Sequence, residues 1–78
     1  MRELLEYLAK GLVEHPEGVR VTEIAGDDGA VVLELAVADG DYGSVIGRGG
    51  RTASALRSVI KAAASGRRRR AFVDIVDA

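Results

Sequence analysis

The chain has 78 residues, of which 47% are hydrophobic and 29% are charged, with a formal net charge of -1 and no cysteine. This composition is typical of one globular domain with a modest hydrophobic core, and it excludes disulfide scaffolds, thiolate metal sites and a uniformly basic coat protein. No segment approaches the roughly 18 apolar residues that a membrane span requires, and the acids Glu3 and Glu6 interrupt any apolar signal region. We therefore expect a single domain over residues 1–78 in a soluble cytoplasmic protein.

Residues 2–14 predict an amphipathic helix. Pro16 ends it, because proline cannot continue the helical hydrogen-bond ladder. His15 suits the C-terminus of a helix, and without a cysteine or a second histidine it has no partners for a metal site. We expect no bound metal and no cofactor. The leucines that recur at helical spacing are Leu4, Leu5, Leu8 and Leu12.

Two strand-like segments follow, at residues 19–24 and 30–38. The first is rich in β-branched residues and the second alternates between apolar and polar positions. The cluster Gly-Asp-Asp-Gly at residues 26–29 predicts a turn, which makes the pair an antiparallel hairpin. The alternation of the first strand fails between Val21 and Ile24, which predicts a β-bulge. The apolar face of the second strand comprises Val31, Leu33, Leu35 and Val37.

The remaining elements are two helices and a strand. Residues 39–41 form a second turn that can cap a short helix over residues 42–46. A second amphipathic helix spans residues 51–64, and Gly66 suits a left-handed cap at its end. Its expected buried stripe comprises Leu56, Val59, Ile60 and Ala63. With a last strand at residues 71–76, the order is α-β-β-α-α-β, and we expect an α+β fold with three strands and all helices on one face of the sheet.

The charge of the chain is distributed unevenly. Residues 43–70 hold eight basic side chains and no acid, whereas the rest of the chain holds three basic side chains and all twelve acids. Such a molecule attracts a polyanion at one pole and repels it at the other. The run Arg-Arg-Arg-Arg at residues 67–70 has a simpler alternative as a solvated basic turn, and the sequence leaves its role open.

The segment Val-Ile-Gly-Arg-Gly-Gly-Arg-Thr at residues 45–52 joins the two predicted helices. Its glycines allow positive φ and close approach of a ligand to the backbone, and the helix that follows offers unpaired N–H donors. A dinucleotide-binding fingerprint would require a third glycine at Thr52 and a preceding strand, and a P-loop would require a lysine after the glycines. The rest of the chain has no matched acid, base or nucleophile, so we do not expect an enzyme. A glycine-rich corner without any ligand remains the alternative.

A G-x-x-G loop between two helices, preceded by Val-Ile, resembles the signature of KH domains, which clamp about four nucleotides against this loop. The element order is similar to the helix-first, type II form of the KH fold. The short chain, His-Pro-Glu at residues 15–17 and the loop sequence resemble small single-domain bacterial KH proteins of the KhpA type. The resemblance implies RNA-binding positions at Val45, Ile46, Gly47, Arg48, Gly49, Gly50, Arg51 and Ser54. This chain departs from the family pattern at Gly49, which makes the loop more pliable, and at Ala53, where a large aliphatic residue is usual.

The resemblance also implies function and partners. It indicates weakly selective binding of single-stranded RNA by a post-transcriptional regulator or RNA chaperone. Family members pair with themselves as homodimers or with a larger KH-containing protein of the Jag type, KhpB. An adaptor that works mainly through this protein pairing, with little RNA binding of its own, is the alternative.

Overall fold

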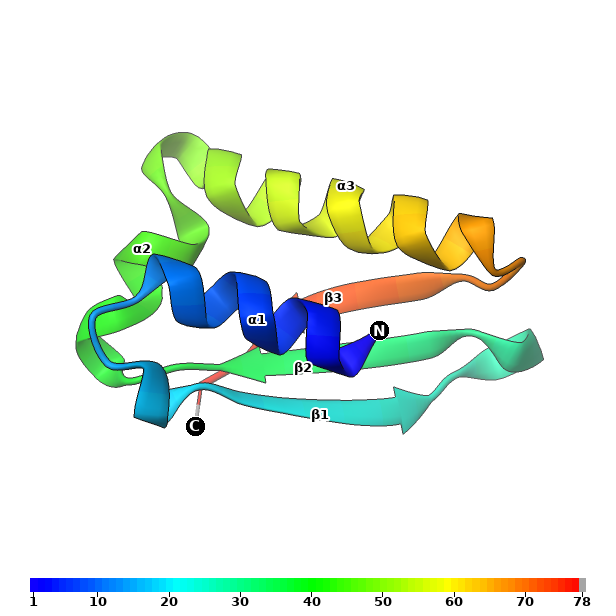
Figure 1. Ribbon diagram of the computed structural model, residues 1–78, viewed down its shortest axis with the longest axis horizontal. Coiled ribbons are helices and arrows are strands. Elements are labelled where there is room, and N and C mark those ends of the chain that lie inside the picture. Colours follow the sequence, from blue (N-terminus) through cyan, green and yellow to red (C-terminus); the bar gives the residue numbers. More distant parts are fainter. Residues whose placement is uncertain (78) are drawn as a thin grey trace.

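Residues 1–77 are described in a computed structural model of the chain, and they form a three-stranded sheet with helices on one face (Figure 1). The order of elements matches the expected α-β-β-α-α-β. The helices are α1 (Arg2–Leu12), α2 (Tyr42–Ile46) and α3 (Arg51–Gly66), and the strands are β1 (Arg20–Ala25), β2 (Val31–Ala36) and β3 (Ala71–Ile75). Within residues 1–77, none of the helices has the length and hydropathy needed to cross a membrane.

The sheet has the order β1-β2-β3, with β2 at its centre. The hairpin predicted from the turn at residues 26–29 is present, and β1 pairs antiparallel with β2. β3 pairs parallel with β2 after the chain has crossed over through α2 and α3. Because β3 has only one neighbour in the sheet, its other edge is unpaired and lies beside α3 (Figure 1).

The core lies between the sheet and the helices. The predicted inward face of the second strand is confirmed, since Leu33 and Leu35 are completely buried and Val31 and Val37 are nearly so. The predicted β-bulge is wrong, because β1 and β2 pair without interruption from Arg20–Ala36 to Ala25–Val31. The loss of alternation in β1 instead reflects an edge strand whose residues are mostly exposed.

The first helix is shorter than predicted, and its apolar stripe is confirmed at Leu4, Leu5 and Leu8 but not at Leu12. α1 ends at Leu12 rather than at residue 14, and the chain continues through a short 3₁₀ turn that starts at Pro16. Leu5 and Ala9 are completely buried, whereas Leu12 is 42% exposed. His15 therefore lies beyond the helix, whose C-cap is Val13, rather than at its C-terminus.

The long helix α3 is rotated relative to the prediction and continues two residues further. Its buried residues are Ala53, Leu56, Ile60 and Ala64, spaced by three or four positions. Val59 is 45% exposed, because it lies about 100° from Ile60 around the helix axis. Gly66 belongs to the last turn of α3 rather than to a left-handed cap, and the left-handed residue of the turn that follows is Arg68, with φ 57°.

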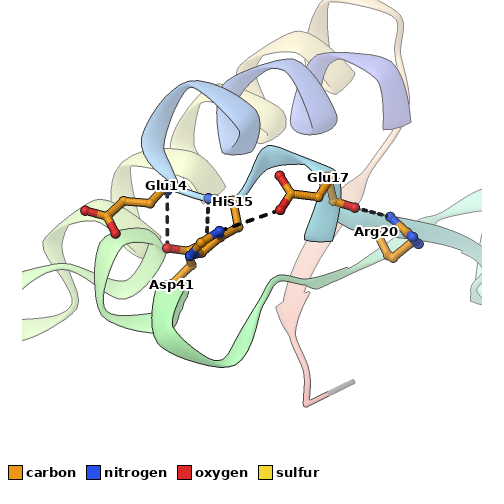
Figure 2. A network of polar contacts seen from close by, with 5 residues as sticks. All are labelled: Glu14, His15, Glu17, Arg20 and Asp41. Carbon is orange, nitrogen blue, oxygen red and sulfur yellow. Dashed lines mark hydrogen bonds and ion pairs between the residues drawn. The ribbon is translucent and has the colours of Figure 1, made fainter.

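Asp41 has a different role from the predicted helix cap. Its side chain does not cap α2, although it stands at the N-cap position. Its carboxylate is 2% exposed and accepts hydrogen bonds from the backbone N–H groups of Glu14, at 3.2 Å, and His15, at 3.0 Å. Figure 2 shows the two N–H groups meeting the carboxylate from the segment that leaves α1. Asp41 thus ties the start of α2 to the connection between α1 and β1.

Candidate nucleic-acid interface

The glycine loop is shaped by three left-handed residues. Gly47, Gly49 and Gly50 have φ of 76°, 65° and 79°. At Gly47 a side chain is also excluded by space, since a Cβ there would lie 2.2 Å from Oγ1 of Thr52. At Gly49 and Gly50 a Cβ would meet open space, so these positions need glycine only for the backbone angle. The loop therefore presents bare backbone at its tip and packs tightly at its base.

The loop is held at both ends by backbone hydrogen bonds. Gly47, at the C-terminal end of α2, donates to the carbonyl of Gly43 in that helix, at 2.9 Å, and Gly50 donates to the carbonyl of Gly47, at 3.2 Å. α3 then begins at Arg51 without any side chain that caps its N-terminus. A long helix that starts in this way directs backbone N–H groups and the positive end of its dipole toward the loop. Such an arrangement favours an anionic ligand.

The basic side chains of the loop are available to a ligand. Arg48 and Arg51 are exposed. Among residues 1–77, the ion pairs are Arg2 with Glu6 and His15 with Glu17, so no carboxylate competes for the two loop arginines. A guanidinium in this state forms charge-assisted hydrogen bonds to phosphate oxygens.

A groove of about 430 Å³ adjoins the loop, and we call it the loop groove. One face of α3 forms one wall, α2 closes one end, and the end of β3 forms the opposite wall. Tyr42 donates a hydrogen bond from its hydroxyl to the carbonyl of Val76, which joins α2 to the chain just after β3. The lining residues are Tyr42, Ile46, Gly50, Ala53, Arg57, Ile75 and Asp77.

The structure separates the expected RNA-binding residues into four groups. Gly47, Arg48, Gly49 and Arg51 form the loop and its exposed rim, while Ile46, 41% exposed, and Gly50 line the groove. Val45 is completely buried in the hydrophobic core and has no surface that a ligand could contact. Ser54 is exposed but lies outside the groove lining, because it is one position beyond Ala53 on the helix.

Five lining residues were missing from the predicted site: Tyr42, Ala53, Arg57, Ile75 and Asp77. Arg57 lies four positions after Ala53, and helical periodicity from the loop would have identified it. Tyr42, Ile75 and Asp77 enter the groove only through tertiary contacts. Asp77 is an acid in a site otherwise suited to an anion, and its carboxylate can accept a hydrogen bond from a base amino group. Ala53 is 4% exposed and forms a shallow floor, consistent with its small size.

The arrangement suits a single-stranded nucleic acid better than a mononucleotide. Backbone N–H groups and arginines are positioned to contact phosphates at the loop, and Ile46, Ala53 and Ile75 offer an apolar surface to bases beside it. Within the part of the chain that the structure describes, no cluster of three histidine, aspartate or glutamate side chains could hold a metal ion.

Comparison of the sequence with known proteins identifies the family to which the chain belongs. The family model of the KhpA/KhpB KH domain matches residues 2–75. RNA-binding protein KhpA of Halalkalibacterium halodurans is 51% identical over 78 residues, covering 99% of this chain and 100% of that protein. RNA-binding protein KhpA of Clostridium acetobutylicum is 49% identical over 76 residues (97% and 100% coverage), and that of Leifsonia xyli is 51% identical over 73 residues (94% and 92%).

No solved structure matches the chain at a significant level. The names of these relatives describe binding proteins rather than enzymes, in agreement with the prediction that this chain is not an enzyme. The family match, the α-β-β-α-α-β order and the G-x-x-G loop between α2 and α3 lead to one conclusion. The chain is a member of the KhpA/KhpB family of KH-domain proteins.

Proposed function

We propose that residues 1–78 act in the cytoplasm as a single KH domain that binds a short segment of single-stranded RNA. Phosphates lie against the loop at residues 47–50, and bases lie in the loop groove. The observation that carries this proposal is the loop itself: three left-handed glycines, an uncapped start of α3 and two unpaired arginines beside an apolar groove. The name of the relatives, RNA-binding protein, supports the same ligand.

The expected binding is modest in affinity and weak in base selection. The loop has no side chain at Gly49, and Ala53 leaves the groove shallow, so few contacts distinguish one base from another. Phosphate contacts dominate such an interface and depend on salt. With about three to five phosphates neutralised, the logarithm of affinity falls with the logarithm of salt concentration at a slope of about -2 to -4.

The direct test replaces Arg48 and Gly49 by aspartate in one variant. Two carboxylates at the loop tip repel phosphate, and we expect RNA affinity to fall more than about 100-fold, because charged hydrogen bonds worth about 1.5–3 kcal/mol each are lost. The control variant is Arg2→Asp with Gly29→Asp, which changes the net charge equally. Gly29 also has positive φ and open space around it, and it lies in the hairpin turn at the opposite end of the molecule from the loop (Figure 1).

Circular dichroism verifies that both variants fold, and fluorescence anisotropy with labelled RNA measures binding. A folded loop variant that binds RNA as tightly as the parent would contradict the proposal. Loss of binding in the control to the same degree would show that net charge, and not the loop, governs the interaction.

We also propose that the chain pairs with a second copy of itself through the helical layer. A groove of about 230 Å³ between α1 and α3 is almost wholly apolar, and two of its residues, Leu12 and Val59, are 42% and 45% exposed. Pairing would give two RNA sites in one particle and raise the affinity for a longer RNA through avidity. A larger Jag-type KH protein is the other partner expected for an RNA chaperone or post-transcriptional regulator of this type.

Sedimentation velocity of the parent and of Val59→Glu tests the pairing. We expect a concentration-dependent dimer in the parent and a monomer in the variant. Tyr7→Glu is the control, because Tyr7 is 77% exposed on α1 but does not line the apolar groove. A parent that pairs yet fails to bind any single-stranded RNA would favour the adaptor over the RNA clamp.

A further inference from the structure

A second and larger groove continues along α3 beyond the loop. It has a volume of about 520 Å³ and lies between the C-terminal half of α3 and β3. We call it the arginine groove. Its lining comprises Arg57, Lys61, Ser65, Arg69 and Arg70, together with strand residues 71–73. Apart from Arg57, none of its lining residues belongs to the loop groove.

The arginine groove is strongly positive. Four of its lining side chains, Arg57, Lys61, Arg69 and Arg70, are basic, all four are exposed, and no acid lines it. None of the four forms an ion pair within residues 1–77. Four unpaired cations around one cavity repel one another, and a polyanion in the cavity relieves this repulsion.

The turn after α3 divides the arginine run. Arg67 donates its backbone N–H to Ala64, Arg68 donates to Ser65, and Arg69 donates back to Ala64 at 2.8 Å. With Arg68 in a left-handed conformation, the turn reverses the chain, and only Arg69 and Arg70 line the groove. All four side chains are exposed, but only half of the run lines the cavity.

The two grooves form one path. Gly50, Ala53 and Arg57 line the loop groove, and Arg57, Lys61 and Ser65 line the arginine groove. Their spacing of three or four residues places all of them on one face of α3. Arg57 lines both grooves and donates from Nε to the carbonyl of Val73 at the open edge of β3, at 3.3 Å.

We propose that the arginine groove binds the phosphates of nucleotides that adjoin the segment held at the loop, so that one RNA strand occupies both grooves. This inference rests on the proposed function. Along α3, the distance from Gly50 to Ser65 is about 22 Å at 1.5 Å per residue, which provides a track well beyond the loop itself. Continuity with the loop groove favours the same RNA strand over a separate acidic peptide along the edge of β3.

The experiment compares oligouridylates of about four nucleotides, the length that one KH loop holds, and about eight nucleotides. The variant is Arg69→Gln with Arg70→Gln. The matched control is Arg67→Gln with Arg68→Gln, which removes two charges from the same turn but from outside the groove. We expect the first variant to weaken binding of the longer RNA about tenfold and to reduce its salt slope by about 1.4, since each lost phosphate contact contributes about 0.7. Binding of the shorter RNA should change little, and the control should affect both RNAs only slightly.

Amide chemical shifts locate the bound RNA. We expect the longer RNA, and not the shorter one, to perturb the amides of Ser65, Phe72 and Val73 in the arginine groove. The inference is overturned if the longer RNA binds no more tightly than the shorter one, or if both double variants have the same effect. Either result leaves the proposed function intact provided that the short RNA still binds and the loop variant abolishes that binding. If the short RNA fails to bind at all, the proposed function itself fails.

Discussion

The loop groove and the arginine groove lie on the same face of α3 and against the same strand, yet they are built differently. The loop groove presents backbone N–H groups, apolar side chains, Arg57 and one acid, Asp77, while Arg48 and Arg51 project from its rim. The arginine groove presents four cations and no acid. The first has a defined backbone geometry at three left-handed glycines, whereas the second depends on long, exposed side chains.

This contrast indicates different contributions to RNA binding. A preorganised backbone positions a phosphate in one place and is sensitive to small changes of geometry. Long basic side chains adapt to the ligand and act mainly through charge, which salt weakens. We therefore expect geometry to dominate at the loop end of α3 and electrostatics to dominate at the arginine end.

The largest expected effect comes from comparing a glycine-to-alanine substitution at the loop end of α3 with the same substitution at its arginine end. Gly47→Ala forces a Cβ against Thr52 at a positive φ, and we expect it to lower the free energy of unfolding by about 2–4 kcal/mol and to abolish RNA binding. Gly66→Ala, within α3 and in open space, should be neutral or stabilising by up to about 1 kcal/mol. Urea denaturation measures both. Equal effects would show that the loop backbone has no special constraint.

A smaller loss of stability is expected from substitution of Asp41, whose carboxylate joins the start of α2 to the segment after α1. Asp41→Ala removes both acceptors from the N–H groups of Glu14 and His15, and we expect a loss of about 2–3 kcal/mol of unfolding free energy. The nearby exposed Asp39→Ala should change stability by less than about 0.5 kcal/mol. Thermal and urea unfolding provide the measurement. If Asp39 and Asp41 proved equivalent, the buried carboxylate would have no role in joining α1 to α2.

The smallest effect is expected from the acid of the loop groove. Asp77→Asn removes a negative charge from the groove proposed to hold RNA, and we expect RNA affinity to rise about two- to fivefold at low salt, with less gain at high salt. Asp74→Asn is the control, since Asp74 lies on β3 outside both groove linings. Titration of labelled RNA at two salt concentrations checks this. A fall in affinity that depends on the base present would instead show that Asp77 accepts a hydrogen bond from a base.

Local sequence patterns predicted much of the fold. The alternation in residues 31–37 identified the buried face of β2, because the side-chain period of a strand leaves little choice once one face is covered. The loop boundaries followed from the glycines, since three of them require backbone angles that other residues avoid. Helix orientation was harder: Val59 and Ala64 are both apolar, and only packing against the sheet decided that Ala64 is buried and Val59 is not.

By itself, the sequence determined the order of the elements and the position of the glycine loop, because both depend on interactions between residues close together along the chain. The tertiary structure alone decided the partners of Asp41, which lie 26 and 27 positions away, and brought Ile75 and Asp77 into the loop groove. It also divided the run of four arginines between a groove and open solvent. Periodicity cannot show this division, because it depends on how one turn folds back against the end of α3.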